Sequence, residues 1–156
     1  MCSQWKVLYF TIFYEQYNEL VMEVSALRKK DPDTYKTHPK TKFLAKIRHV
    51  IWQRIVLNPK SKEFHLGDTF PEQYRCYKRA KSGLPNRYRL FFRYKSKDGK
   101  IVILWMNSDK TLRSQSSKSD PYTVFLKMLK SKKIPPNWKQ LVSKSTDIKT
   151  KRAKKN

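Results

Sequence analysis

The pattern of apolar and polar positions changes its period along the chain, and each change predicts a different element. Residues 5–13, WKVLYFTIF, are rich in β-branched and aromatic residues and predict a first strand. From Tyr14 to Lys30 apolar residues recur at spacings of three and four, which predicts an amphipathic helix. The stretch DPDTYKTHP, residues 31–39, ends that helix because proline, aspartate and threonine favour turns.

A second helix is expected after this break, and a loop follows it. Its apolar positions are again three and four residues apart, and they are Leu44, Ile47, Ile51 and Ile55. The helix is predicted to end near Asn58-Pro59, because proline cannot continue it. Residues 58–73 then read as a loop.

Three strands are predicted after the loop. Residues 74–81, YRCYKRAK, and residues 87–95 alternate basic with apolar or aromatic side chains. Asp98-Gly99 is typical of a hairpin turn. Residues 100–106, KIVILWM, form an unbroken apolar run, which favours a central strand covered on both faces, with Trp105 in the core.

A polar loop over residues 107–119 leads to a last helix. Asp120 and Pro121 are suited to its N-cap and first turn. Its apolar stripe is Tyr122, Phe125, Met128 and Leu129. Residues 143–156 hold six Lys or Arg and almost no apolar residue, so we expect a disordered basic tail after one domain over residues 1–142.

This order of elements predicts an α+β fold. The N-terminal strand joins a mainly antiparallel sheet, two helices pack on one face of it, and a C-terminal helix follows. Within the strand RYRLFFRY, residues 87–94, alternation places Arg87, Arg89 and Arg93 on one face. We expect that arginine-bearing face to be left open, as a surface that can meet phosphates.

Composition strengthens the expectation of a polyanionic partner. The 156 residues carry 36 Lys or Arg against 12 Asp or Glu, a formal charge of +24. Such an imbalance opposes compact folding, and nucleic acid is the commonest polyanion that would balance it. Cys2 and Cys76 are too few for a disulfide framework and lack metal-ligand spacing, and Cys76 is expected in the core. No signal peptide or transmembrane segment is predicted, and a cytoplasmic location fits reduced thiols.

Three stretches resemble one family of bacterial proteins. They are RYRLFFRY at 87–94, ILWMNSDKTLR at 103–113 and DPYTVFLKMLKSKKIPPNW at 120–138. In this order they resemble the YhaV family of the RelE superfamily of toxins, and weaker similarity covers residues 5–66. The resemblance implies a RelE-like fold and an endoribonuclease toxin of a type II toxin–antitoxin system, which stops translation and growth by cutting messenger RNA.

The resemblance also implies a site made of basic residues, with no metal and no cofactor. Arg79 and Lys81 match the paired basic positions that RelE-type toxins carry on one strand. Arg89 matches the arginine of the following YRL strand, and Arg113 matches a later arginine. Tyr122 matches an aromatic position near the C-terminal helix, although it lies further from Arg113 than that pattern has it.

Metal-free RNA cleavage uses the 2′-OH as the nucleophile and needs a proton acceptor and charge stabilisation. Arginines stay protonated, so Arg79, Arg89 and Arg113 are expected to hold phosphate oxygens. Neighbouring cations would depress the pKa of Lys81, which makes it a candidate base, and Tyr122 is the alternative. We assign the remaining basic-face residues to RNA binding, and they are Arg75, Tyr77, Arg87, Arg93 and Lys118.

Two other functions stay open at this stage. A non-catalytic RNA- or ribosome-binding protein would carry the same charge. ParE-like gyrase inhibitors share the same fold, which alone does not fix a function. The family resemblance also implies a cognate antitoxin of the swapped-hairpin AbrB type, an RNA substrate that is free or ribosome-bound, and contact with operator DNA only through the toxin–antitoxin complex. No membrane partner is expected.

Overall fold

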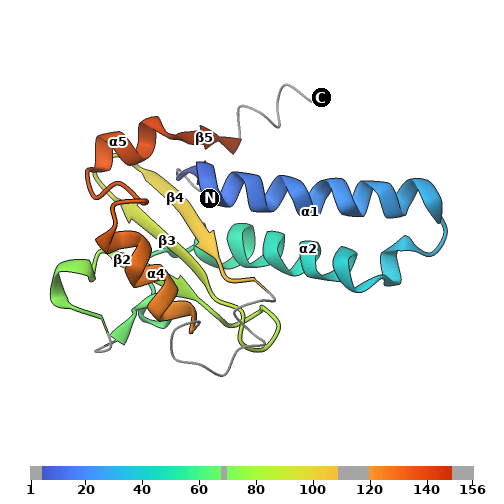
Figure 1. Cartoon of the computed structure of the whole chain (residues 1–156), viewed down its shortest axis with the longest axis horizontal. Coiled ribbons are helices and arrows are strands. Elements are labelled where there is room, and N and C mark those ends of the chain that lie inside the picture. The colour runs from blue at the N-terminus through green and yellow to red at the C-terminus, as the bar shows by residue number, and fades with distance from the viewer. Residues whose placement is uncertain (1–4, 68–69, 109–119, 149–156) are drawn as a thin grey trace.

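A five-stranded sheet forms the centre of the protein, with the strand order β2-β3-β4-β1-β5 (Figure 1). The computed structural model describes residues 5–67, 70–108 and 120–148. The strands are β1 (Lys6–Phe10), β2 (Tyr77–Ala80), β3 (Leu90–Lys95), β4 (Lys100–Met106) and β5 (Ser145–Asp147). β1 pairs with β4 in parallel, and the other three neighbouring pairs are antiparallel. The expected α+β class and mainly antiparallel sheet are confirmed.

Helices lie against both faces of this sheet. They are α1 (Thr11–Lys30), α2 (Pro39–His49), α4 (Pro121–Lys130) and α5 (Trp138–Ser143), with single 3-10 turns at Tyr35–Thr37, Lys62–Phe64 and Glu72–Tyr74. α2 continues as a π-helical segment, Val50–Ile55, so its helical path reaches nearly to the predicted Asn58-Pro59. Figure 1 shows α1 and α2 side by side, projecting beyond the sheet. None of the helices in the described ranges has the length and apolar character needed to span a bilayer.

The central strand β4 separates two cores. Its residues Ile101, Ile103 and Met106 pack with α1 and α2, whereas Val102, Leu104 and Trp105 pack with α4 and α5. All of them are nine-tenths buried or more, so the prediction of a strand covered on both faces is confirmed. The prediction of an open arginine-bearing face is wrong, because the apolar stripe of α4 and the start of α5 cover most of that face.

A β-bulge at Leu104 sets which side chains face α4. The register runs from Phe91 opposite Trp105 to Phe92 opposite Ile103, so β4 carries one extra residue there. Leu104 and Trp105 therefore both face α4, and Met106 turns toward α1. A bulge re-aims the side chains that follow it, and here it directs the end of β4 toward the two helices on different faces.

An aromatic stack fixes α4 to the sheet. The ring of Phe125 lies 4.1 Å from that of Phe91, nearly parallel to it, and 6.2 Å from that of Trp105. Asp120 caps the helix as predicted, since its carboxylate accepts a hydrogen bond from the Thr123 amide, and Pro121 occupies the first turn. The helix thus starts at a defined point, with Tyr122 one turn before Phe125.

α1 begins three residues earlier than the sequence pattern indicated. The stretch from Thr11 to Phe13 is helical rather than extended. Phe13 and Tyr17 pack edge-on against Tyr9 of β1, with ring centroids 4.8 Å and 5.1 Å away. Because this packing rewards an immediate turn from strand to helix, it outweighs the β preference of the aromatic stretch.

Three boundaries later in the chain also differ from the prediction. β2 begins at Tyr77, so Cys76 lies before it and is exposed, and the expectation of a core cysteine is wrong. β3 begins at Leu90 rather than at residue 87. Residues 145–147, assigned to the tail, form β5 against β1, and Ile148 is buried in the core. The folded part therefore extends at least to residue 148.

Replacing Phe125 with alanine is expected to lower the free energy of unfolding by about 3–5 kcal/mol, because the ring is fully buried among other aromatic rings. Urea unfolding followed by circular dichroism measures this. The control is Met22→Ala, at a side chain that is 71% exposed, and it is expected to change stability by less than about 0.5 kcal/mol. Equal effects of the two changes would contradict the described packing of α4.

Candidate active site

Three of the five residues predicted to be catalytic lie together at one end of the face that α4 covers. Arg79 comes from β2, Arg89 directly precedes β3, and Tyr122 comes from the first turn of α4. The Arg79 guanidinium carbon lies 6.0 Å from the centroid of the Tyr122 ring, and Arg89 Nε donates a hydrogen bond to the Tyr122 hydroxyl at 3.1 Å. We call these three residues the arginine cluster.

Arg79 is a buried cation with unused donors. Only 9% of the residue is exposed. Its Nη2 donates to the carbonyl of His65 at 2.9 Å, while its buried Nε and Nη1 have no hydrogen-bond partner among the residues described. A buried donor without an acceptor is costly, and more so when the group is charged. The two remaining donors of this guanidinium are therefore suited to the oxygens of an anion.

Arg89 is oriented by bonds on both sides. Its Nη1 donates to the carbonyl of Tyr88 at 2.9 Å, and its Nε donates to Tyr122. The phenolic oxygen of Tyr122 therefore accepts a bond, and its own proton stays available to another acceptor. The ring of Tyr122 is held between Phe70 and Phe91, at centroid distances of 6.2 Å and 5.8 Å.

The positive charge of the cluster has no carboxylate beside it among the residues described. In the ranges 5–67, 70–108 and 120–148 the ion pairs use Lys6, Lys40 and Arg54, and none includes Arg79 or Arg89. No three His, Cys, Asp or Glu side chains gather there in a way that could hold a metal ion. The groups that the cluster offers are thus two guanidinium ions and one phenol.

The other two residues predicted to be catalytic are Lys81 and Arg113. Lys81 follows the last residue of β2 and is exposed, two positions beyond Arg79. Arg113 lies outside the described residues, as does Lys118, which was assigned to RNA binding. The structure therefore brings Arg79, Arg89 and Tyr122 into contact, whereas Lys81 lies at the exposed end of β2.

Two of the residues assigned to RNA binding lie in turns rather than on strands. Arg75 is exposed and precedes β2, and its carbonyl accepts a bond from Lys78 Nζ at 3.0 Å. Partial burial lowers the pKa of that lysine. Arg87 is exposed in the turn before β3 with a φ of 74°, so it does not share the strand face of Arg89 and Arg93 as predicted. Both arginines are exposed at the surface.

Arg93 and Tyr77 have structural partners. The guanidinium carbon of Arg93 lies 5.4 Å from the ring centroid of Tyr77 and 5.3 Å from that of Trp138, and its Nη1 donates to the carbonyl of Pro136 at 3.0 Å. Arg93 thereby holds the start of α5 against the sheet. Tyr77 is only 3% exposed beneath it, so its ring is not at the surface where a base could stack on it.

Two amides that the sequence analysis did not single out stand behind the cluster. Asn107 is 1% exposed and bonds to the backbone of Arg87 and Arg89. Gln16 of α1 bonds to the backbone of Met106. An asparagine directly after an apolar strand reads as the start of a loop, and only the folded chain shows that this side chain turns inward.

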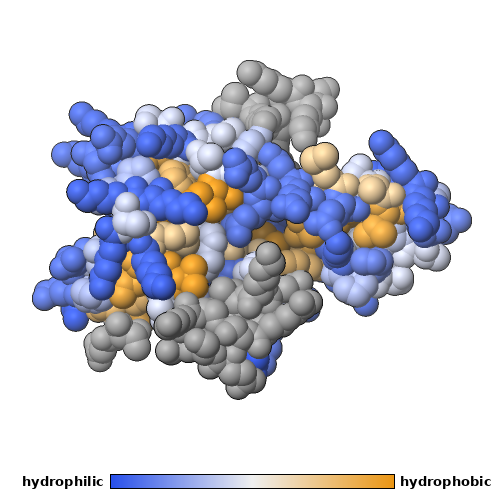
Figure 2. Space-filling view, in the orientation of Figure 1, coloured by the Kyte–Doolittle hydropathy of each residue, from blue (hydrophilic) through white to orange (hydrophobic). Residues whose placement is uncertain are grey.

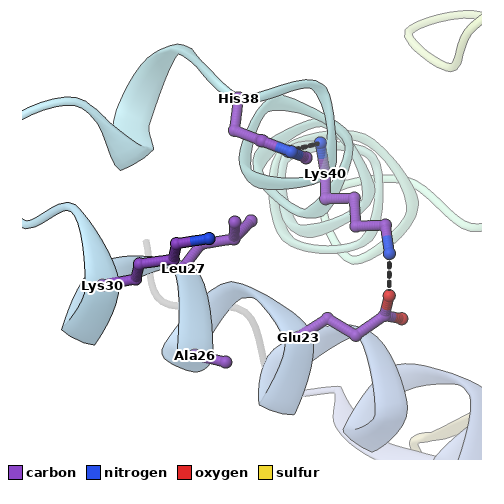
Figure 3. A pocket seen from close by; sticks show the side chains of 6 residues that line it. All are labelled: Glu23, Ala26, Leu27, Lys30, His38 and Lys40. Atoms are coloured by element: carbon purple, nitrogen blue, oxygen red, sulfur yellow. Dashed lines mark hydrogen bonds and ion pairs between the residues drawn. The ribbon is translucent and has the colours of Figure 1, made fainter.

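The surface elsewhere offers a hollow of about 320 Å³ between the end of α1 and the start of α2. Figure 3 shows Lys40 reaching across it to pair with Glu23, while the Lys40 amide donates to His38 Nδ1. The Lys40–Glu23 ion pair ties α1 to α2, in the part of this helical pair that projects beyond the sheet. Figure 2 shows that hydrophilic side chains dominate one broad face, with smaller apolar areas between them.

Comparisons with known proteins agree on one family. Residues 7–146 match the family model of YhaV toxins, described as toxins with endonuclease activity of a toxin–antitoxin system. The chain is 40% identical over 144 residues to Toxin YhaV of Escherichia coli O6:H1 and to Ribonuclease toxin YhaV of Escherichia coli K12, covering 92% of this chain and 93% of each relative. No solved structure matches the chain.

The burial of Tyr77 gives a test at alkaline pH. Burial raises the pKa of this phenol above its ordinary value of 10.0, and Arg93 opposes the shift only in part. A raised pKa stabilises the fold fully below about pH 10, and this contribution is lost as the pH rises through the folded pKa. As the pH rises above about 10, we expect the free energy of unfolding to fall less in Tyr77→Phe than in the wild type, as urea unfolding at each pH measures. Tyr35→Phe is the control, and parallel curves for wild type and Tyr77→Phe would contradict the expectation.

Proposed function

The chain belongs to the YhaV family of toxins with endonuclease activity, and we propose that it cleaves RNA at the arginine cluster without a metal ion. One observation carries the proposal: in the part of the chain that the structure describes, the buried guanidinium of Arg79 has two donors without an acceptor, next to the bonded pair of Arg89 and Tyr122. A relative that is 40% identical is named a ribonuclease toxin, which indicates RNA as the substrate.

The scissile phosphate is the anion that fits this cluster best. Arg79 Nε and Nη1 have no acceptor among the residues described, and charged donors of this kind suit the oxygens of a phosphate. Arg89 lies directly before the neighbouring strand β3, so the phosphate would lie between two guanidinium ions. The two cations would stabilise the extra negative charge of the phosphorane.

The reaction needs no external nucleophile. The 2′-oxygen attacks the adjacent phosphorus, the O2′–P bond forms, and the P–O5′ bond breaks. The proton of the 2′-OH passes to a base, and the leaving 5′-oxygen receives a proton. The products are a 2′,3′-cyclic phosphate and a 5′-OH end.

Tyr122 is better placed than Lys81 for proton transfer. Its oxygen lies inside the cluster and accepts a bond from Arg89, while its own proton is free to be donated to the 5′-oxygen. Lys81 lies beyond the end of β2 and is exposed. We assign Lys81, with Arg75 and Arg87, to the cationic surface that guides RNA to the cluster. Arg113 is proposed as a third phosphate ligand on the basis of the family pattern.

Such a nuclease requires an inhibitor in its own cell. We propose a cognate antitoxin of the AbrB type that offers an acidic segment to the arginine cluster, since complementary charge speeds association. The toxin would reach operator DNA only within that complex. Its action would take place in the cytoplasm, on messenger RNA that is free or on the ribosome, and would stop translation.

Replacing Arg89 with alanine is expected to lower the rate of RNA cleavage by about 10²–10³, the usual effect of removing a contact that stabilises the transition state. The measurement uses a defined RNA with EDTA present, followed by analysis of the end groups. The wild type should leave a cyclic phosphate and should not cut a substrate with a 2′-deoxy residue at the cleavage site.

Arg28→Ala is the matched control for this change. It removes the same charge from the last turn of α1, where Arg28 lies over the Tyr35 ring, far from the cluster along the helical hairpin. Its cleavage rate should stay within about threefold of the wild type. Full activity of a folded Arg89→Ala protein, or cutting of the deoxy substrate, would overturn the proposed chemistry. Cleavage only on translating ribosomes would restrict the substrate.

The assignment of proton transfer is tested by comparing Tyr122→Phe with Lys81→Ala. Tyr122→Phe keeps the ring packing and loses the hydroxyl, so kcat should fall by about 10²–10⁴. Lys81→Ala should mainly raise KM, because it removes a surface cation. Single-turnover cleavage and RNA titration separate the two constants. A larger loss of kcat in Lys81→Ala than in Tyr122→Phe would move the role to Lys81.

A further inference from the structure

The turn that leads into β3 is strained, and something must hold it. Arg87 has a φ of 74°, a left-handed conformation that disfavours side chains with a Cβ. Such a residue keeps this conformation only when its surroundings impose it. Arg89 follows two positions later, so the conformation at Arg87 determines the direction from which Arg89 reaches Tyr122.

The Asn107 side chain supplies the restraint. Its Oδ1 accepts the backbone N–H of Arg89 at 2.6 Å, and its Nδ2 donates to the carbonyl of Arg87 at 2.9 Å. The backbone N–H of Asn107 also donates to the carbonyl of Arg89, at 3.4 Å. One buried amide thus bonds on both sides of Tyr88. Among side chains of this length, only a carboxamide offers the donor and the acceptor together.

Asn107 is itself fixed from the other face of the sheet. Gln16 of α1 donates through Nε2 to the carbonyl of Met106 at 2.7 Å, and its Oε1 accepts the Met106 N–H at 3.2 Å. These two bonds replace the strand pairing that Met106 lacks on that side and hold the end of β4. A continuous set of contacts therefore runs from Gln16 through Met106 and Asn107 to Arg89 and Tyr122.

We propose that Asn107 is a positioning residue, which sets the direction of Arg89 toward Tyr122 and the scissile phosphate. The amide does not touch the substrate in this role. It acts through the backbone of Arg87 and Arg89, and Gln16 supports it from α1. The catalytic part of this inference depends on the proposed ribonuclease function, whereas the effect on the Arg89 side chain does not.

Two substitutions separate the functions of the amide. Asn107→Ala removes both side-chain bonds and with them this restraint on the Arg87 backbone. Asn107→Asp keeps an acceptor for the Arg89 N–H but places a carboxylate oxygen against the Arg87 carbonyl, where the donor was. Both should lower kcat by about 10–100-fold with a smaller change in KM, because a small displacement of a catalytic group costs rate.

Asn137→Ala is the matched control. The Asn137 side chain caps α5 by accepting the Gln140 N–H at 3.0 Å, a comparable bond away from the cluster. Its kcat should stay within about threefold of the wild type. Thermal unfolding of each variant identifies any loss of fold. If Asn107→Ala and Asn137→Ala lose kcat in the same proportion to their loss of thermal stability, the positioning role is refuted.

A second readout does not depend on cleavage. The Nε–H signal of Arg89 in a ¹⁵N NMR spectrum reports its bond to Tyr122, and Tyr122→Phe shows where that signal moves when the bond is lost. Asn107→Ala should move the signal the same way. An unmoved signal overturns the inference, even if activity falls, because Asn107 would then not act through Arg89. If the wild type cuts no RNA but the signal moves, the proposed function fails and the positioning role stands.

Arg87→Gly completes the test, since glycine adopts a positive φ without strain. This change removes a cation and will itself weaken RNA binding. In that background Asn107→Ala should cost at least about threefold less in kcat than it does in the wild type, as a double-mutant cycle measures. An unchanged cost would show that the strained conformation of Arg87 has no part in positioning.

Discussion

The packing of Phe125 determines where the arginine cluster can form. Its ring stacks on Phe91 and lies near Tyr77 and Trp105, so the apolar stripe of α4 seals the middle of a face that also carries basic residues. Tyr122 lies one turn earlier, where the helix reaches the start of β3. The face is closed along most of its length and stays polar at one end, and Arg79 and Arg89 lie at that end.

The chain is strongly basic, but we expect its positive charge to act on a substrate mainly at the arginine cluster. Most of the lysines are on the surface, where water and salt weaken their mutual repulsion. Arg79 differs because it is buried, and two of its donors find no acceptor within the described ranges, in a region where a charge is poorly solvated. The free protein thus carries a destabilising group that an oxyanion would satisfy. The same property would help an acidic antitoxin segment bind, since both ligands relieve the same cost.

Sequence periodicity predicted the parts of the fold that local physics decides. The buried run of β4, the hairpin at Asp98-Gly99 and the cap at Asp120 depend on neighbouring residues, and they were found as expected. The choice of Arg79, Arg89 and Tyr122 as site residues came from family resemblance, and in the structure their side chains lie close together. Their catalytic role stays a prediction. The cover over the arginine face, the turned backbone at Arg87 and the inward Asn107 depend on contacts between distant segments, which periodicity does not encode. Arg93 illustrates this limit. Strand alternation predicted the face on which it lies, but not its contacts with Trp138 and Pro136, which come from a distant segment. Nor did alternation predict that Tyr77 would be buried beneath Arg93.

The position of β1 has a consequence for how the protein is made. This strand lies between β4 and β5, so Leu8 pairs with Val102 on one side and Asp147 on the other. In a chain emerging from the ribosome, β1 stays unpaired until β4 has followed it, and its second neighbour β5 comes later still. Contacts between such distant segments slow folding, because a long loop must close before they form. The sheet that supports the arginine cluster therefore cannot be completed before residues 145–147 have been made. Synthesis thus includes an interval before the sheet is complete, in which an antitoxin already present in the cell can meet the nascent protein.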